Sequence, residues 1–106
     1  MRPGRFLLAW AVVLAAADFA PAHADTVRVT IDNLVFAPAS ISAKVGDTVE
    51  WVNNDVFAHT ATVRGDWDVM IAPKKTARFV LKKAGAVEYF CRFHPNMKGR
   101  IAVAPK

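Results

Sequence analysis

The chain of 106 residues lacks several features that mark common classes of protein. It has a single cysteine, Cys91, so no disulfide can form within the chain. Its longest apolar run, residues 6–17, has 12 residues, whereas a helix that crosses a bilayer needs about 20. No glycine-rich phosphate loop is present, and no basic run is interleaved with stacking aromatic residues. These absences exclude an internal disulfide framework and argue against a membrane-spanning helix and a nucleic-acid partner.

The N-terminal segment has the pattern of a secretory signal peptide. Arg2 and Arg5 precede the apolar run, and the small residues Ala22 and Ala24 flank His23 at a cleavage site. We expect cleavage after Ala24, so that residues 1–24 are the signal peptide and residues 25–106 are one exported domain. No cysteine follows the run to carry a lipid, so we expect a soluble periplasmic protein without a stable membrane anchor.

The expected exported domain is small and moderately basic. Residues 25–106 hold twelve Lys and Arg against eight Asp and Glu, a formal net charge of +4. A basic surface attracts nucleic acid, anionic membranes or acidic proteins, and an exported chain rarely meets nucleic acid, so an acidic protein partner is favoured. The alternative is a solvated surface that only keeps the protein soluble. A domain of this size buries only about 60% of its unfolded surface, so a bound metal would add stability.

Apolar and polar residues alternate along most of the exported part, which is typical of strands with one buried face. Val27, Val29 and Ile31 share one face of the first such segment. Similar segments recur about every ten residues between turn signals, and residues 65–68 are interpreted as a loop. The pattern predicts an all-β fold, an antiparallel sandwich or barrel. The expected strands are residues 27–31, 41–45, 48–52, 57–63, 77–81, 87–91 and 99–104, with a short apolar piece at 34–36.

One short segment carries three soft or borderline metal ligands. Cys91, His94 and Met97 recur at three-residue steps. Thiolate and thioether sulfur suit copper, imidazole suits copper as well as zinc, and two nitrogens, one thiolate and a weak axial Met form an electron-transfer copper site. The alternative is an inert buried thiol at Cys91, a turn at His94 and core packing by Met97.

The second nitrogen ligand would come from His59. His59 has the same parity as Ala61 and Val63 and therefore faces inward, while Thr60, Thr62 and Arg64 are expected on the solvent side. A buried histidine is more often a hydrogen-bonded core residue than a ligand. Without His23, however, the exported domain has only His59 and His94, and the copper hypothesis needs two histidines.

These residues resemble those of the cupredoxins, the type 1 blue copper proteins, and most closely the small amicyanin, pseudoazurin and plastocyanin group. The resemblance covers nearly all of residues 25–106, and its specific parts are Trp51-Val52-Asn53-Asn54, His59-Thr60 and Tyr89-Phe90-Cys91-Arg92-Phe93-His94-Pro95-Asn96-Met97-Lys98-Gly99. It implies a Greek-key β-sandwich of about eight strands. It also implies one copper per chain, bound by His59, Cys91 and His94 with Met97 as the weak axial ligand.

Two residues depart from the family pattern. The family often has Pro before the first ligand histidine and Asn after it, whereas this chain has Ala58 and Thr60. That Asn helps to hold the two ligand segments together. We therefore expect either the hydroxyl of Thr60 or backbone groups to take its place.

The expected function is one-electron transfer by Cu(II)/Cu(I) cycling rather than catalysis, because four protein ligands leave no open position for a substrate. The resemblance implies a monomer that exchanges electrons with a dehydrogenase, a c-type cytochrome or an oxidase-like partner through the exposed edge of His94. A copper carrier or buffer that never cycles, and a structural zinc domain, remain the alternatives. The candidate contact residues are the apolar Phe57, Phe93 and Pro95 and the basic Lys74, Lys75, Arg92, Lys98 and Arg100.

Overall fold

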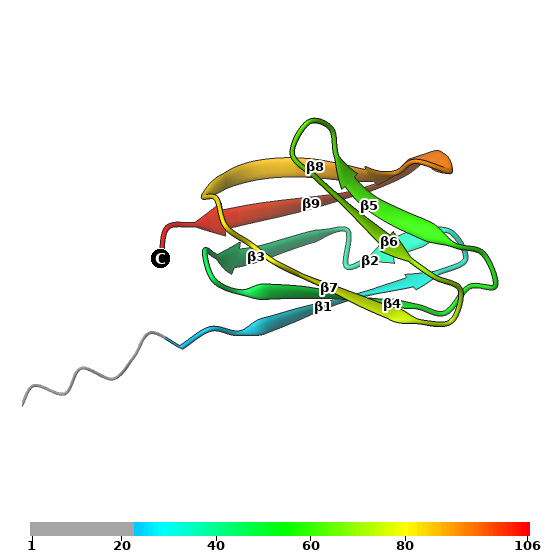
Figure 1. Cartoon of the computed structure of the whole chain (residues 1–106), viewed down its shortest axis with the longest axis horizontal. Coiled ribbons are helices and arrows are strands. Elements are labelled where there is room, and N and C mark those ends of the chain that lie inside the picture. Colours follow the sequence, from blue (N-terminus) through cyan, green and yellow to red (C-terminus); the bar gives the residue numbers. More distant parts are fainter. Residues whose placement is uncertain (1–22) are drawn as a thin grey trace, which may run out of the picture.

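The computed structural model describes residues 23–106, which form a two-layered β-sandwich (Figure 1). Within these residues there are nine strands and no helix, so no helix is long and apolar enough to cross a membrane. Most of the predicted signal peptide, residues 1–22, lies outside the described part. The strands are β1 (Thr26–Asp32), β2 (Val35–Ala37), β3 (Ser40–Lys44), β4 (Thr48–Asn53), β5 (His59–Val63), β6 (Trp67–Ile71), β7 (Thr76–Val80), β8 (Gly85–Cys91) and β9 (His94–Ala104).

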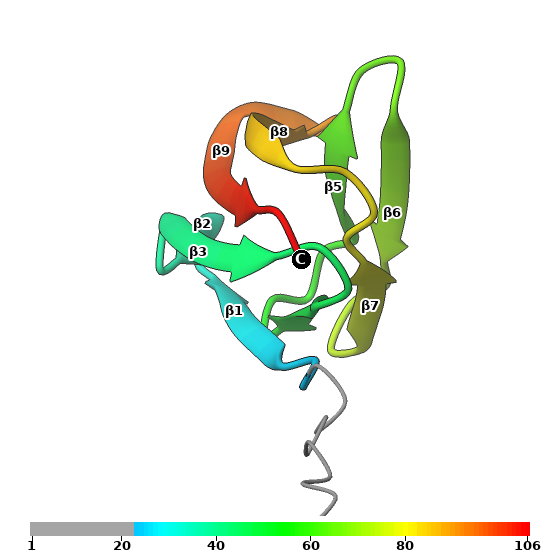
Figure 2. The ribbon, with the colours of Figure 1, turned by 90° about the vertical axis from the view of Figure 1, so that its left-hand side faces the viewer.

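The strands are divided between two sheets, which Figure 2 shows from one end. One sheet has the order β2-β1-β4-β7 and the other the order β3-β9-β8-β5-β6. The predicted sandwich is therefore confirmed, but its strands are not all antiparallel, because β1 pairs with β4 and β3 with β9 in parallel. The chain crosses from one sheet to the other between β2 and β3 and again between β3 and β4, so β3 lies in the sheet that does not contain its neighbours in the sequence.

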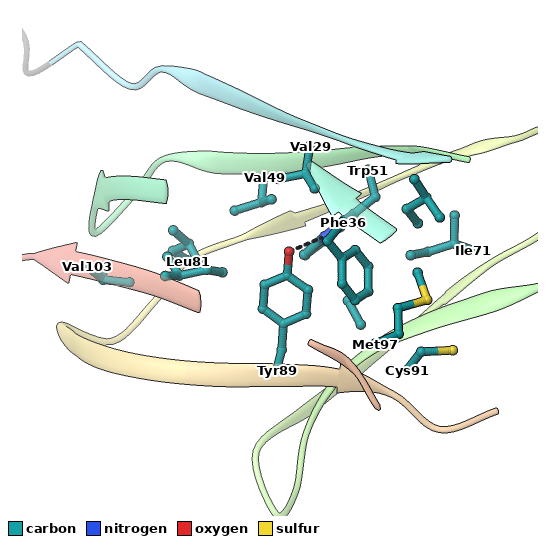
Figure 3. Packing of buried hydrophobic residues seen from close by; sticks show 13 residues of the cluster. Val29, Phe36, Val49, Trp51, Ile71, Leu81, Tyr89, Cys91, Met97 and Val103 are labelled. Atoms are coloured by element: carbon teal, nitrogen blue, oxygen red, sulfur yellow. Dashed lines mark hydrogen bonds between the residues drawn. The ribbon is translucent and has the colours of Figure 1, made fainter. Parts of the chain in front are cut away.

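The alternating residues fill the space between the sheets. Val29, Ile31, Val49 and Trp51 are fully buried, as their parity predicts. The indole N–H of Trp51 donates to the Tyr89 hydroxyl at 3.2 Å, which satisfies two polar groups inside the core (Figure 3). Cys91 and Met97 lie at one end of this core, and Leu81 and Val103 lie at the other (Figure 3).

Two sequence-based interpretations are wrong in their details. Residues 65–68 are not all loop, because β6 begins at Trp67, whose ring stacks on Phe79 at 4.7 Å between ring centroids. Trp67, Val69 and Ile71 alternate inward, so the strand pattern was present but was hidden by the polar residues around Trp67. The last strand also begins earlier than expected, at His94, because the ligand segment folds back directly after Cys91.

Candidate metal centre

Three potential ligands meet at one end of the sandwich. His59 begins β5, Cys91 ends β8 and His94 begins β9, so the fold joins residues that are 35 positions apart. The Cys91 Sγ lies 3.7 Å from His59 Nδ1 and 3.8 Å from His94 Nδ1. One ligand atom from each of the three residues lies within 4.8 Å of the other two. The donors therefore converge on a space that a single ion can fill.

His59 is fully buried, as its parity predicts, and its ring contacts the carboxylate of Asp55. Its Nε2 lies 2.8 Å from Asp55 Oδ2. Burial alone would raise the pKa of Asp55, but the backbone N–H groups of Leu34 and Asn33 and the His59 ring outweigh it, so the pKa is lowered. An ionised Asp55 only accepts hydrogen bonds, so this contact requires a proton on His59 Nε2, and in the neutral ring Nδ1 is then the nitrogen with a free lone pair.

The second half of the centre comes from the turn between β8 and β9. A register shift at Phe90 and Cys91 leaves Cys91 paired with His94, which brings the thiol and the imidazole to the same end of the sheet. Cys91 is fully buried, whereas His94 is only partly buried. His94 therefore reaches from the interior to the surface, while Cys91 does not.

Met97 belongs to the buried cluster that contains Cys91. It is 5% exposed and lies beside Cys91 at the same end of the core (Figure 3). Met70, the other methionine considered for the axial position, is 53% exposed on β6. Burial beside Cys91 thus favours Met97 over Met70 as the candidate axial ligand.

Thr60 connects the segment of His59 to the segment of Cys91, the role expected of it because the chain lacks the family's Asn at this position. Its backbone N–H donates to Cys91 Sγ at 3.4 Å, and its Oγ1 accepts the backbone N–H of Arg92 at 2.9 Å. Both expected substitutes, the hydroxyl and the backbone, are therefore used. The prediction that Thr60 and Thr62 lie on the solvent side is wrong, because Thr60 is 0% and Thr62 6% exposed beneath Asp68 and the Arg92 backbone.

An apolar surface surrounds the exposed part of His94. Phe57 and Phe93 are about half exposed, and the Phe57 ring centroid lies 6.3 Å from that of His94. A hollow of about 440 Å³ opens next to the imidazole. Its lining residues are Leu34, Phe93, His94, Pro95, Asn96 and Met97.

The donor chemistry fits a type 1 copper ion. A thiolate, two imidazole nitrogens and a nearby thioether match the soft and borderline ligands of such a site. Zinc also accepts a thiolate and two imidazoles, but its sites do not call for a thioether. The buried surroundings keep the site dry, which suits an ion that changes its charge without changing its ligands.

The sequence pattern does not identify Asp55, which lies between the expected strands 48–52 and 57–63. Its backbone N–H donates to Asn53 Oδ1 at 2.9 Å, which forms a local turn. The Asp55 carboxylate, however, reaches outward to Asn33, Leu34 and His59. A carboxylate four residues before a candidate ligand histidine was the available signal, although nothing in that spacing shows that the two side chains meet.

Known proteins show the same pattern over most of the chain. Residues 4–103 match the family model of the cupredoxin-like domain. The chain is 31% identical over 100 residues to amicyanin of Paracoccus versutus, covering 85% of this chain and 71% of the relative. It is 34% identical over 91 residues to methylamine utilization protein MauL of Methylorubrum extorquens, covering 81% and 80%.

Similarity extends to plastocyanins and to solved structures. Plastocyanin of Scenedesmus fuscus is 35% identical over 95 residues, covering 74% of this chain and 97% of the relative. The crystal structure of amicyanin from Paracoccus versutus superposes with a TM-score of 0.65 at 31% identity, covering 79% of this chain and 84% of that one. The fold, the convergent Cys and His side chains and these matches agree, and the chain belongs to the cupredoxin-like family.

Proposed function

We propose that this protein is a periplasmic type 1 copper protein that carries single electrons between redox partner proteins, and that it is not an enzyme. The observation that carries the proposal is the convergence of Cys91 Sγ with the Nδ1 atoms of His59 and His94 in a buried space. We assign these three residues as the strong ligands and Met97 as the weak axial ligand. One bound copper would supply the Cu(II)/Cu(I) couple.

The residues around the site favour the reduced state and a fixed geometry. With a thiolate ligand the oxidised centre carries one more positive charge than the reduced centre, so a dry, apolar surround disfavours oxidation and raises the potential. Asp55 contacts His59 and Thr60 contacts Cys91, so groups of the protein itself hold both proposed ligands. Little rearrangement is then needed when the electron arrives or leaves.

The exposed edge of His94 is the expected route for electrons. Phe57, Phe93 and Pro95 surround it with apolar surface, and a carrier that must leave its partner quickly uses a small contact of this kind. Lys98 and Arg100 are exposed on β9 beyond the turn, whereas the charge of Arg92 is shared with Asp68 at 3.0 Å. The exposed basic side chains favour an acidic partner, such as a dehydrogenase, a c-type cytochrome or an oxidase-like protein. We propose that this protein binds that partner as a monomer.

The proposal is tested by loading residues 25–106 with copper and recording the visible spectrum and a cyclic voltammogram. We expect one copper per chain, an intense blue charge-transfer band and a reversible one-electron wave. Zinc binding would give no colour, and a copper carrier without redox cycling would bind Cu(I) but give no reversible wave. Either of those results would overturn the proposed function.

Export is tested separately. We propose cleavage after Ala24 because Ala22-His23-Ala24 follows the apolar run, and the next residue, Asp25, is hydrogen-bonded to the sandwich through Thr48. The intact mass of the periplasmic protein should correspond to a chain that begins at Asp25. A mass that includes Met1 or Arg2 would contradict both processing and export by this route.

A further inference from the structure

A chain of hydrogen bonds leads from the backbone beside Cys91 to a carboxylate on the edge strand β6. The Arg92 N–H donates to Thr60 Oγ1 at 2.9 Å, Thr60 Oγ1 lies 2.9 Å from Thr62 Oγ1, and Thr62 Oγ1 donates to Asp68 Oδ1 at 2.6 Å. The Arg92 guanidinium closes the ring, since its Nε donates to Asp68 Oδ1 at 3.0 Å and its Nη2 to Oδ2 at 3.2 Å. These four residues form what is called here the Thr relay.

The donor and the acceptor of each hydrogen bond in the Thr relay follow from the number of protons that each group carries. The hydrogen bonds from Arg92 and then from Thr62 outweigh burial and lower the pKa of Asp68, so this carboxylate is ionised and only accepts. Thr62 has one hydroxyl proton and gives it to Asp68. Thr60 must then give its own proton to Thr62, which leaves its lone pairs for the Arg92 N–H. The three successive bonds from the Arg92 N–H to Asp68 point the same way, so each strengthens the next, and the guanidinium donates to the same carboxylate.

The Thr relay contacts the segment around the proposed ligand Cys91 at two places. Arg92 directly follows Cys91, so the Arg92 N–H belongs to the peptide that carries the thiol away from β8. The Thr60 N–H donates to Cys91 Sγ at 3.4 Å. An N–H bond to the sulfur withdraws electron density from the thiolate. The orientation of Thr60 therefore affects both the position and the electronic character of Cys91.

We propose that Thr62 and Asp68 are positioning residues for the metal centre, which orient Thr60 so that it holds the Cys91–Arg92 peptide and donates to the thiolate. This inference rests on the proposed copper site. Thr62 and Asp68 are not proposed ligands, and they act through Thr60, which bonds both Cys91 and Arg92. Thr62 and Asp68 lie on β5 and β6, so the edge strand becomes part of the centre.

The relay is tested first in the metal-free protein, where copper binding plays no part. Thr62→Val removes the hydroxyl at nearly constant volume and leaves the Thr60 proton without its acceptor. We expect the Arg92 amide to exchange with solvent about tenfold faster by NMR, the factor that one hydrogen bond of ordinary strength represents. Thr62→Ser restores the hydroxyl and should restore slow exchange. Thr30→Val is the matched control, because the Thr30 hydroxyl bonds Ala37 O on the other sheet.

The copper-loaded protein supplies the second readout. Thr62→Val and Asp68→Ala should retain one copper but lower the reduction potential and shift the charge-transfer band, because the Thr60 N–H bond to sulfur weakens. Thr30→Val should change neither. Unchanged exchange, potential and spectrum in Thr62→Val, or equal changes in Thr30→Val, would overturn the relay. A wild-type protein that binds no copper would instead overturn the proposed function, and the exchange measurement would still decide the relay.

Asp25, the residue at which the exported chain is proposed to begin, belongs to a charged cluster with Lys44 and Asp47. Its backbone N donates to Asp47 Oδ1 at 2.9 Å, and Asp47 is 3% exposed. Lys44 Nζ lies 3.2 Å from Asp47 Oδ1 and 3.5 Å from Asp25 Oδ2. In the uncleaved chain this cluster holds one cation and two anions. Cleavage after Ala24 would turn the Asp25 amide into an ammonium group, and the cluster would become neutral.

We further propose that signal-peptide removal creates a stabilising ion pair between the new N-terminus and Asp47. A hydrogen bond between charged groups is roughly twice as strong as one between neutral groups. The newly exported chain would thus gain stability at the moment when it must fold. This inference rests on the proposed cleavage site, which the mass measurement tests independently.

The ion pair is tested with two purified chains, one that begins at Asp25 and one that keeps Ala24. The chain beginning at Asp25 should melt at the higher temperature at neutral pH, because in the longer chain Asp25 offers only a neutral amide. In an Asp47→Asn background the difference should disappear. Equal melting temperatures of the two chains, or a difference that persists in the Asp47→Asn background, would overturn the proposal.

Discussion

The two ends of the sandwich each contain a carboxylate bonded in the same way. At the metal end, Asp55 accepts the backbone N–H groups of Asn33 and Leu34 and faces the His59 ring at 2.8 Å. At the opposite end, Asp47 accepts the backbone N–H groups of Asp25 and Lys44 and faces the Lys44 ammonium at 3.2 Å. Each carboxylate joins two segments that are distant in the sequence.

The difference lies in the third partner. Lys44 has a flexible, mostly aliphatic side chain whose charge strengthens a structural contact. Asp47 therefore contributes only to the stability of the fold. His59 is a proposed ligand, so Asp55 also decides which ring nitrogen is free to bind metal. The same backbone arrangement thus serves only folding at one end, and both folding and metal binding at the other. Substitutions at the two ends should separate these roles.

The largest effect is expected for Cys91→Ala at the metal end. Loss of the thiolate removes the donor for sulfur-to-Cu(II) charge transfer, so the intense visible band should vanish completely. Asp47→Asn at the other end should keep the band. Absorption spectra of the two copper-loaded variants check this, and a blue Cys91→Ala protein would contradict the ligand assignment.

Asp55→Asn and Asp47→Asn form the matched pair that tests the comparison most directly. In Asp55→Asn the new side-chain amide would present an N–H group toward one of the backbone donors and would no longer fix the His59 tautomer. We expect the copper affinity to fall about 10- to 100-fold, the usual effect of removing a group that orients a metal ligand. The affinity of Asp47→Asn should equal that of the wild type in a competition titration with a copper chelator. Equal losses in both variants would mean that Asp55 acts only through folding.

Met97→Gln changes one proposed ligand and leaves the other three proposed ligands in place. An amide oxygen stabilises Cu(II) better than a thioether does, so the potential should fall while copper stays bound. Cyclic voltammetry checks the result. The same substitution at the exposed Met70 is the control, and an effect at Met70 without one at Met97 would reverse the axial assignment.

Acid should weaken the Asp47 contact in a predictable direction. The backbone N–H groups of Asp25 and Lys44, and then the Lys44 ammonium, outweigh burial and lower the pKa of Asp47 in the folded protein. The contact therefore adds stability above the unfolded-state pKa of about 3.9, and that stability is lost as the pH falls through the folded-state value. Metal-free wild type should melt above Asp47→Asn at pH 7, and the difference should shrink as the pH falls below about 3.9. A constant difference at all pH values would contradict this assignment.

The smallest effect is expected for surface charge. Lys98 lies next to the metal end, so Lys98→Glu should slow association with an acidic partner. The difference in rate from the wild type should become smaller as salt is added. Lys83 lies at the opposite end, where it pairs with Asp66 at 3.2 Å. Lys83→Glu makes the same change of charge there and should leave the association rate unchanged. Stopped-flow measurements check both variants. Equal slowing by both would show that only net charge matters.

Much of the fold and of the proposed site was predictable because strand parity is a local property. Val29, Trp51 and Cys91 are buried, as alternation predicts, since successive side chains in a strand point to opposite faces. The same rule assigns Thr60 and Thr62 to the outer face, but they are not solvent-exposed, because Asp68 and the backbone of Arg92 cover them. Parity tells on which face a residue lies, but it does not tell what lies over that face.

The sequence by itself determined the ligand types, the spacing of Cys91, His94 and Met97, and the inward direction of His59, because each depends on neighbours within a few residues. Only the tertiary structure decided that Asp55 meets His59, that Thr60 bonds both Cys91 and Arg92, and that Asp68 completes the Thr relay. Those contacts depend on strand register and on how the two sheets meet. A hydrogen bond requires two atoms within about 3 Å, and no local pattern in the sequence specifies a distance between segments tens of residues apart.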